Sequence, residues 1–150
     1  MPYQSQKEVR AFYERWKVHV FTFCRLFLGD EKRAHDVAPG AFLAYLREGR
    51  PLERTQLPDS LLRCVLESAK HQCAPGRLPQ ADGKALDRAL LSLPCEQRAV
   101  FILRSVLAVP DASIASATGF SPERVRKLWV QGLFQLRNLL PENSFKEHVR

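Results

Sequence analysis

Apolar side chains recur every three or four positions along residues 9–27. This spacing places them on one face of a helix, where they can pack against a core. They are Val9, Phe12, Tyr13, Trp16, Val20, Phe23 and Phe27. The pattern predicts a long amphipathic helix that ends near Gly29, because glycine is common just after helix ends. Asp30 is a residue type that can cap the next helix.

The same spacing continues from Ala34 to Arg47 and predicts a second helix. Pro39 and Gly40 interrupt this pattern. Proline lacks the backbone N–H that a helix interior uses, and glycine has a low helix propensity. We therefore expect a kink or a break at this point.

A third helix is predicted after residues 48–58, where prolines, glycine and charged residues indicate a loop. Asp59 or Ser60 can cap this helix, which should extend to about Gln72. Residues 74–83, APGRLPQADG, then lose the helical spacing and combine prolines with glycines. We interpret them as a linker.

Four more helical runs follow the linker. The first ends at Pro94, and the second extends from Cys95 to Leu107. The third begins near Asp111 and stops at Gly119, and the fourth continues to about Leu140. No segment shows the alternation that is typical of strands.

The fold class follows from these patterns. The sequence predicts an all-α protein made of two small helical bundles joined by a short linker. Residues 1–73 form the first bundle, residues 74–83 the linker, and residues 84–150 the second bundle.

One segment of the second bundle predicts a DNA-binding motif. Residues 112–128, ASIASATGFSPERVRKL, combine a short helix of small residues, a glycine-containing turn and a capped helix start. This is typical of a helix-turn-helix, whose second helix offers its N-terminal side chains to the major groove. A generic antiparallel helix pair, without DNA binding, is the alternative that this pattern leaves open. Arg124, Arg126 and Lys127 can contact bases or phosphates there, and Ser121 with the helix N-terminus can hold a phosphate.

Composition narrows the classes of function. The chain has 150 residues, of which 45% are hydrophobic and 26% charged, as in ordinary globular proteins. Its net charge of +7 is compatible with a polyanionic partner but specifies none. Because no apolar stretch is long enough to cross a membrane or to act as a secretory signal, we expect a cytoplasmic protein without membrane insertion.

The cysteines and histidines give little indication of chemistry. Cys24, Cys64, Cys73 and Cys95 lie at wide spacings without a C-x-x-C pair, so we expect reduced and mostly buried thiols. His71 lies near two of these cysteines, but a second close pair of ligands is missing. We therefore expect no metal site and no cofactor.

Enzyme motifs are also missing from the sequence. It contains no nucleophile elbow, no H-E-x-x-H and no glycine-rich phosphate loop. His35 and Asp36 are adjacent, but neighbours on a helix point about 100° apart. We therefore expect no enzymatic activity.

Two stretches resemble one protein family. Residues 86–128 resemble the promoter-binding C-terminal domain of extracytoplasmic-function sigma factors of RNA polymerase, with its pattern L-x-x-L-P-x-x-x-R followed by a helix-turn-helix. The matching positions are Leu90, Leu93, Pro94, Arg98, Ile114, Ala115, Gly119, Ser121 and Val125. Residues 23–48 are similar to the family's polymerase-binding segment. The matching positions there are Leu28, Gly29, Asp30, Ala34, Asp36, Val37, Phe42 and Leu43.

The resemblance implies a factor that binds core RNA polymerase and directs promoter recognition in transcription initiation. The first bundle, which corresponds to region 2 of the family, would bind core RNA polymerase, whose subunits include β and β′. It would dock on the clamp helices of the β′ subunit through contact residues on the second predicted helix. These are Asp36, Phe42, Leu43 and Arg47. The region 4-like second bundle would read double-stranded promoter DNA through Ser121, Glu123, Arg124, Arg126 and Lys127. An anti-sigma protein is a further implied partner, and no cofactor is implied.

The sequence departs from the family at specific positions. Pro39 and Gly40 replace a polar and an acidic residue at the expected polymerase contact, and Ser60 replaces an aromatic in the helix that normally opens DNA. The later part of the last helix lacks the usual cations. Its positions are Leu128, Gln131, Leu133 and Gln135.

These departures keep a second hypothesis open. A sigma-like adaptor or decoy would retain the two-bundle scaffold but bind an anti-sigma factor or another protein through apolar surfaces. Val130 and Phe134 extend the apolar face of the last helix and favour such a surface. The retained cations at the helix start favour the initiation factor.

Overall fold

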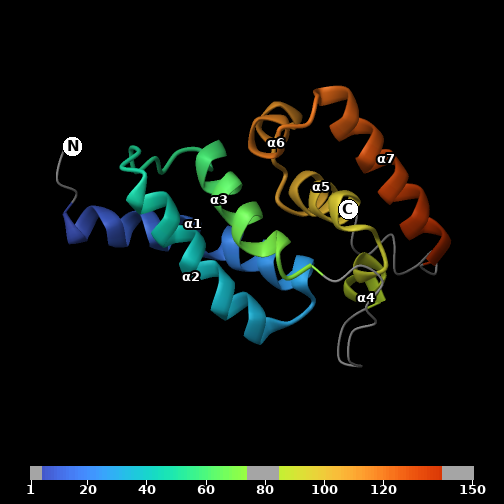
Figure 1. Cartoon of the computed structure of the whole chain (residues 1–150), viewed down its shortest axis with the longest axis horizontal. Coiled ribbons are helices and arrows are strands. Elements are labelled where there is room, and N and C mark those ends of the chain that lie inside the picture. The colour runs from blue at the N-terminus through green and yellow to red at the C-terminus, as the bar shows by residue number, and fades with distance from the viewer. Residues whose placement is uncertain (1–4, 74–84, 140–150) are drawn as a thin grey trace.

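A computed structural model describes residues 5–73 and 85–139. In these residues the protein is all-α, as predicted, and contains no strand (Figure 1). The N-terminal segment contains α1 (Gln6–Leu28), α2 (Glu31–Arg47) and α3 (Asp59–Lys70). The C-terminal segment contains α4 (Ala85–Leu91), α5 (Cys95–Phe101), the π-helical turn η1 (Ile102–Val106), α6 (Asp111–Thr118) and α7 (Pro122–Leu139).

Local capping defines both ends of α1. The Ser5 side chain accepts a hydrogen bond from the Glu8 N–H at 3.1 Å. Gly29, at φ +73°, ends the helix and donates its N–H to the Arg25 carbonyl at 2.8 Å. Asp30 then caps α2 by accepting the Lys32 N–H at 2.9 Å. The predicted helix end and the predicted cap are both confirmed.

The second helix does not break at Pro39. α2 continues from Glu31 to Arg47, so the break that the sequence allowed is absent. Pro39 and Gly40 are exposed, while Ala38 and Ala41 beside them are buried against the rest of the fold. Tertiary packing of the apolar face outweighs the poor helix propensity of these two residues.

The third helix begins differently from the prediction. Neither Asp59 nor Ser60 caps it; Pro58 stands at the N-cap position and makes no side-chain hydrogen bond to the helix. Asp59 is instead the first helical residue, where its carboxylate interacts favourably with the helix dipole. The helix ends at Lys70, slightly before the predicted Gln72.

A continuous core runs through the described part of the molecule. α1 packs against α2 and α3 and also against α4, α5 and η1 of the C-terminal segment, and Figure 1 shows how these helices are arranged. α3 also packs against α6, so the N-terminal and C-terminal segments share buried surface. The predicted linker, residues 74–83, lies outside the described residues.

One expectation about the cysteines is wrong. Cys73 and Cys95 form a disulfide, whereas the sequence predicted four reduced thiols. Cys73 follows the end of α3, and Cys95 is the first residue of α5. The fold brings the two cysteines together. Cys24 and Cys64 are free and buried, as expected.

Candidate nucleic-acid interface

The start of α7 is built by a tight turn from α6. Gly119 adopts a left-handed conformation at φ +83° and donates its N–H to the Ala115 carbonyl at 2.9 Å. The Ser121 side chain then accepts the Arg124 N–H at 3.1 Å, which satisfies one of the free donors at the start of α7. This turn fixes the direction in which α7 leaves α6.

Buried residues anchor α7 to the rest of the fold. Val125 and Leu128 are buried on its inner face, where α7 packs against α5 and α6. A Cβ atom at Gly132 would lie 3.7 Å from side-chain atoms of Leu93 and Phe101, so α7 approaches α5 closely there. The opposite face of the helix start is therefore left to solvent.

The predicted DNA-facing residues lie on this solvent side. All five are exposed and occupy the turn and the first helical turns of α7: Ser121, Glu123, Arg124, Arg126 and Lys127. The structure thus brings together three cations, one acid and a capping serine. Cations at a helix start are suited to phosphate oxygens and to the acceptor edge of guanine.

Arg124 is already engaged within the protein. Its Nη2 lies 2.6 Å from Oε2 of Glu96, and its guanidinium stands 4.1 Å from the centre of the Phe120 ring. Both partners of the ion pair are about half exposed, so solvent screens this interaction and it is weak. Sequence analysis missed Glu96 because it lies 28 residues away in the chain.

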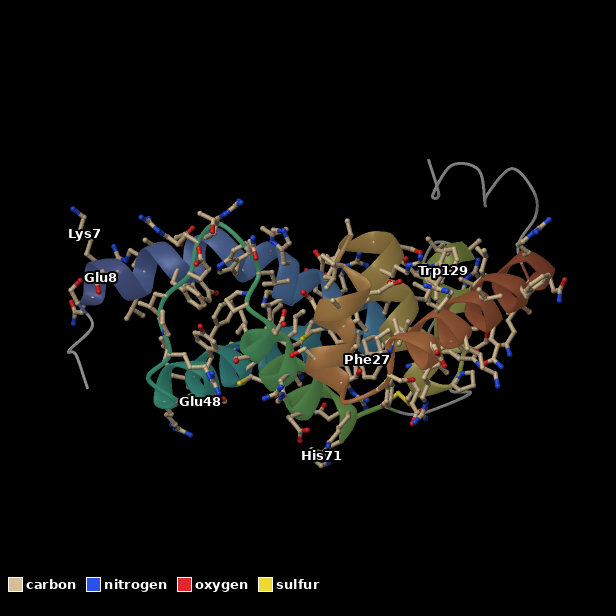
Figure 2. The ribbon with its side chains drawn as sticks, turned by 90° about the horizontal axis from the view of Figure 1, so that it is seen from above. Lys7, Glu8, Phe27, Glu48, His71 and Trp129 are labelled. Carbon is tan, nitrogen blue, oxygen red and sulfur yellow. A yellow bond between two sulfur atoms is a disulfide. The ribbon has the colours of Figure 1, made fainter. Side chains whose placement is uncertain are left out.

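A second cluster of contacts, centred on Trp129, attaches the middle of α7 to the neighbouring elements. The indole N–H of Trp129 donates to Oγ of Ser105 at 2.8 Å, and the Arg104 guanidinium lies 3.9 Å from the centre of the Trp129 ring. Arg104 also pairs with Asp111 at 3.0 Å. Trp129, labelled in Figure 2, therefore connects α7 to η1 and, through Arg104, to α6.

The predicted polymerase-binding residues on α2 separate into two groups. Asp36, Leu43 and Arg47 are exposed and, at intervals of seven and four residues, lie on one face of the helix. Phe42 is only 5% exposed and packs edge-on against Phe12 with ring centres 6.1 Å apart. Phe42 therefore belongs to the core and not to this surface, which corrects its assignment as a contact residue.

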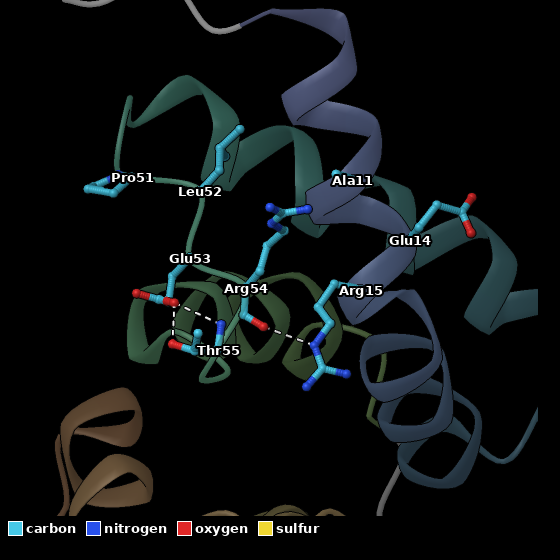
Figure 3. A pocket seen from close by; sticks show the side chains of 8 residues that line it. All are labelled: Ala11, Glu14, Arg15, Pro51, Leu52, Glu53, Arg54 and Thr55. Carbon is cyan, nitrogen blue, oxygen red and sulfur yellow. Dashed lines mark hydrogen bonds between the residues drawn. The ribbon is translucent and has the colours of Figure 1, made fainter.

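A shallow groove between α1 and the 48–58 loop is the hollow drawn in Figure 3. Side-chain N–H groups of α1 beside this groove donate hydrogen bonds to backbone carbonyls of the loop. The Nε–H of Arg15 donates to the Arg54 carbonyl at 2.9 Å, and the Trp16 indole N–H donates to the Glu53 carbonyl at 2.7 Å. This arrangement anchors the loop to α1.

The free thiols are poor nucleophiles. Burial raises the pKa of both Cys24 and Cys64 to about 12. Cys64 also donates a hydrogen bond from Sγ to the Glu48 carboxylate at 3.1 Å, which further favours the protonated thiol. Neither sulfur is a thiolate near neutral pH.

Comparison with models of known protein families and with curated protein sequences finds no match. The family resemblance therefore depends on the sequence motifs quoted above. In the described ranges, no helix is long and apolar enough to cross a membrane.

Proposed function

We propose that the protein is a transcription initiation factor of the extracytoplasmic-function sigma type. It binds core RNA polymerase through its N-terminal segment and reads promoter DNA through the start of α7. The observation that carries this proposal is the exposed group of Arg124, Arg126 and Lys127 on a helix held by a short turn from α6.

The geometry supports this assignment in two respects. Val125 and Leu128 bury the inner face of α7, so the helix can present its start to a groove without losing its packing. The exposed stripe of Asp36, Leu43 and Arg47 on α2 offers a separate surface for the polymerase. No cofactor or catalytic step belongs to this function.

The test is transcription from a genomic promoter library with core polymerase and the purified full chain. We expect specific transcripts from the unaltered protein and their loss with the triple variant Arg124→Ala/Arg126→Ala/Lys127→Ala, while co-elution with core polymerase persists. Each base contact removed should weaken promoter binding by about 1–3 kcal/mol. Arg137→Ala, which removes a cation from the far end of the same helix, is the matched control and should change little.

Glu96→Gln provides a test in the opposite direction. The variant removes the carboxylate that neutralises Arg124, so affinity for promoter DNA and its salt dependence should both increase.

Undiminished specific transcription by the triple variant would contradict the assignment of the start of α7 as the DNA-reading surface.

A second candidate is a sigma-like adaptor or decoy that binds another protein. Two observations favour it: Phe134 on α7 is 60% exposed, and Glu96 engages one of the three cations at the helix start. This candidate predicts no stable association with core polymerase by folded protein. The same co-elution experiment therefore distinguishes the two functions.

A further inference from the structure

The four cysteines differ sharply in their surroundings. Cys24 and Cys64 are buried as free thiols, with exposed fractions of 0% and 6%. Cys73 and Cys95 form the disulfide and are both half-buried, so they are less enclosed than the two free cysteines. The disulfide is drawn in yellow in Figure 2.

A buried cation lies beside one sulfur of the disulfide. Nη1 of Arg98 donates a hydrogen bond to Sγ of Cys73 at 3.4 Å, and Arg98 is only 1% exposed. A guanidinium at this distance stabilises negative charge on the sulfur. In the described part of the chain, no such donor contacts Cys95. The two sulfurs are therefore unequal as leaving groups.

The disulfide also lies where the two segments meet. It ties the end of the α3 segment to the first residue of α5. Nearby, Arg98 donates to the Phe27 carbonyl of α1 at 2.7 Å, and Arg63 of α3 donates to the Ser116 carbonyl of α6 at 2.9 Å. Opening the disulfide leaves only non-covalent contacts to hold α3 against the C-terminal segment, apart from the chain itself.

We propose that Cys73–Cys95 is a thiol–disulfide exchange site for small thiols of the glutathione class, and that its reduction loosens the contact between α3 and α6. A disulfide in a reducing compartment is commonly transient, which agrees with the cytoplasmic location expected from the sequence. This inference is independent of DNA binding and goes beyond the proposed function.

The exchange proceeds in two balanced steps. The thiolate of the small thiol attacks Sγ of Cys95, the protein disulfide breaks, and the electron pair leaves on Sγ of Cys73 beside Arg98. A second small thiolate then attacks the sulfur that the first small thiol contributed to the mixed disulfide. The two small thiols become joined, and the Cys95 thiolate is released. The protein gains two electrons and two protons, and two small thiols become one small disulfide. That disulfide is the oxidant of the reverse reaction.

The first experiment measures the redox state of each cysteine. The oxidised full chain is equilibrated in buffers of varying reduced-to-oxidised glutathione ratio, quenched with acid, alkylated and mapped by mass spectrometry. We expect reversible reduction of the Cys73–Cys95 pair and a glutathione adduct that is several-fold more abundant on Cys95 than on Cys73. Cys24 and Cys64 should be protected from reaction with glutathione while the chain is folded. A pair that stays oxidised in excess reduced glutathione, or an adduct mainly on Cys73, overturns the proposed exchange.

The second experiment measures the structural consequence. Hydrogen–deuterium exchange of the α3 and α6 amides is compared between the oxidised and reduced protein. We expect about tenfold faster exchange in the reduced protein and in the variant Cys73→Ser/Cys95→Ser. Cys64→Ser, which keeps the disulfide and a hydrogen-bond donor to Glu48, is the matched control and should behave as the oxidised chain. Equal exchange in both redox states would contradict the proposed loosening.

Discussion

At the scale of the residue, Arg98 is the most connected side chain described. It is 1% exposed, and its five N–H groups reach five acceptors: the carbonyls of Phe27, Leu90, Leu91 and Leu93 and the sulfur of Cys73. Three of those carbonyls lie in the last turns of α1 and α4, where helix dipoles concentrate partial negative charge. Burial lowers the pKa of Arg98, but the full set of acceptors matches the charged form.

Arg98→Met should therefore lower the free energy of unfolding by about 3–5 kcal/mol, because it leaves buried carbonyls without donors while it preserves most of the side-chain volume. Urea denaturation of the oxidised protein measures this change. Arg126→Met is the matched control, since Arg126 is exposed, and it should change stability by less than about 0.5 kcal/mol. A loss below about 1 kcal/mol for Arg98→Met would show that water replaces the guanidinium.

At the scale of the element, packing and capping decide where helices begin and end. α1 ends where Gly29 adopts a left-handed conformation, and a Cβ atom there would overlap the side chain of Leu91. α2, in contrast, continues through Gly40, where a Cβ atom would meet nothing within 4 Å. The two glycines therefore have opposite roles.

Gly40→Ala should raise the free energy of unfolding by about 0.5–1 kcal/mol, because alanine has the higher helix propensity and the position is open. Gly29→Ala should lower it, because both the positive φ and the contact with Leu91 oppose a side chain. Denaturant unfolding of the two variants beside the parent protein measures both effects. Stabilisation by Gly29→Ala would contradict the close approach of α1 to α4.

At the scale of the whole molecule, the two predicted bundles share one core. Buried residues of α1 and α3 pack against the C-terminal segment, and the Cys73–Cys95 disulfide adds a covalent connection across the predicted linker. The polar contact of Arg63 with the Ser116 carbonyl lies on the same interface. The segments are thus energetically coupled.

We expect a single thermal transition by calorimetry, with equal calorimetric and van't Hoff enthalpies. The variant Cys73→Ser/Cys95→Ser should have a free energy of unfolding about 3 kcal/mol lower than that of the oxidised protein, because no disulfide closes the intervening loop in its unfolded state. Two resolved transitions in the oxidised protein would show instead that the bundles unfold independently.

The amino-acid sequence alone determined the features that depend on near neighbours in the chain. Helical spacing predicted the all-α class, and Gly29, Asp30 and Gly119 marked helix boundaries correctly. The start of α7 was found because its turn and cap are encoded within a few residues. The sigma-factor function remains a prediction from motifs.

Only the tertiary structure decided which distant residues meet. Phe42 and Leu43 are adjacent, yet one lies in the core and the other is 52% exposed, because a helix turns them in different directions. The Cys73–Cys95 disulfide joins positions 22 residues apart, and Arg98 reaches a carbonyl of α1 71 residues away. Local periodicity carries no information about such pairs, since they form only when helices pack together.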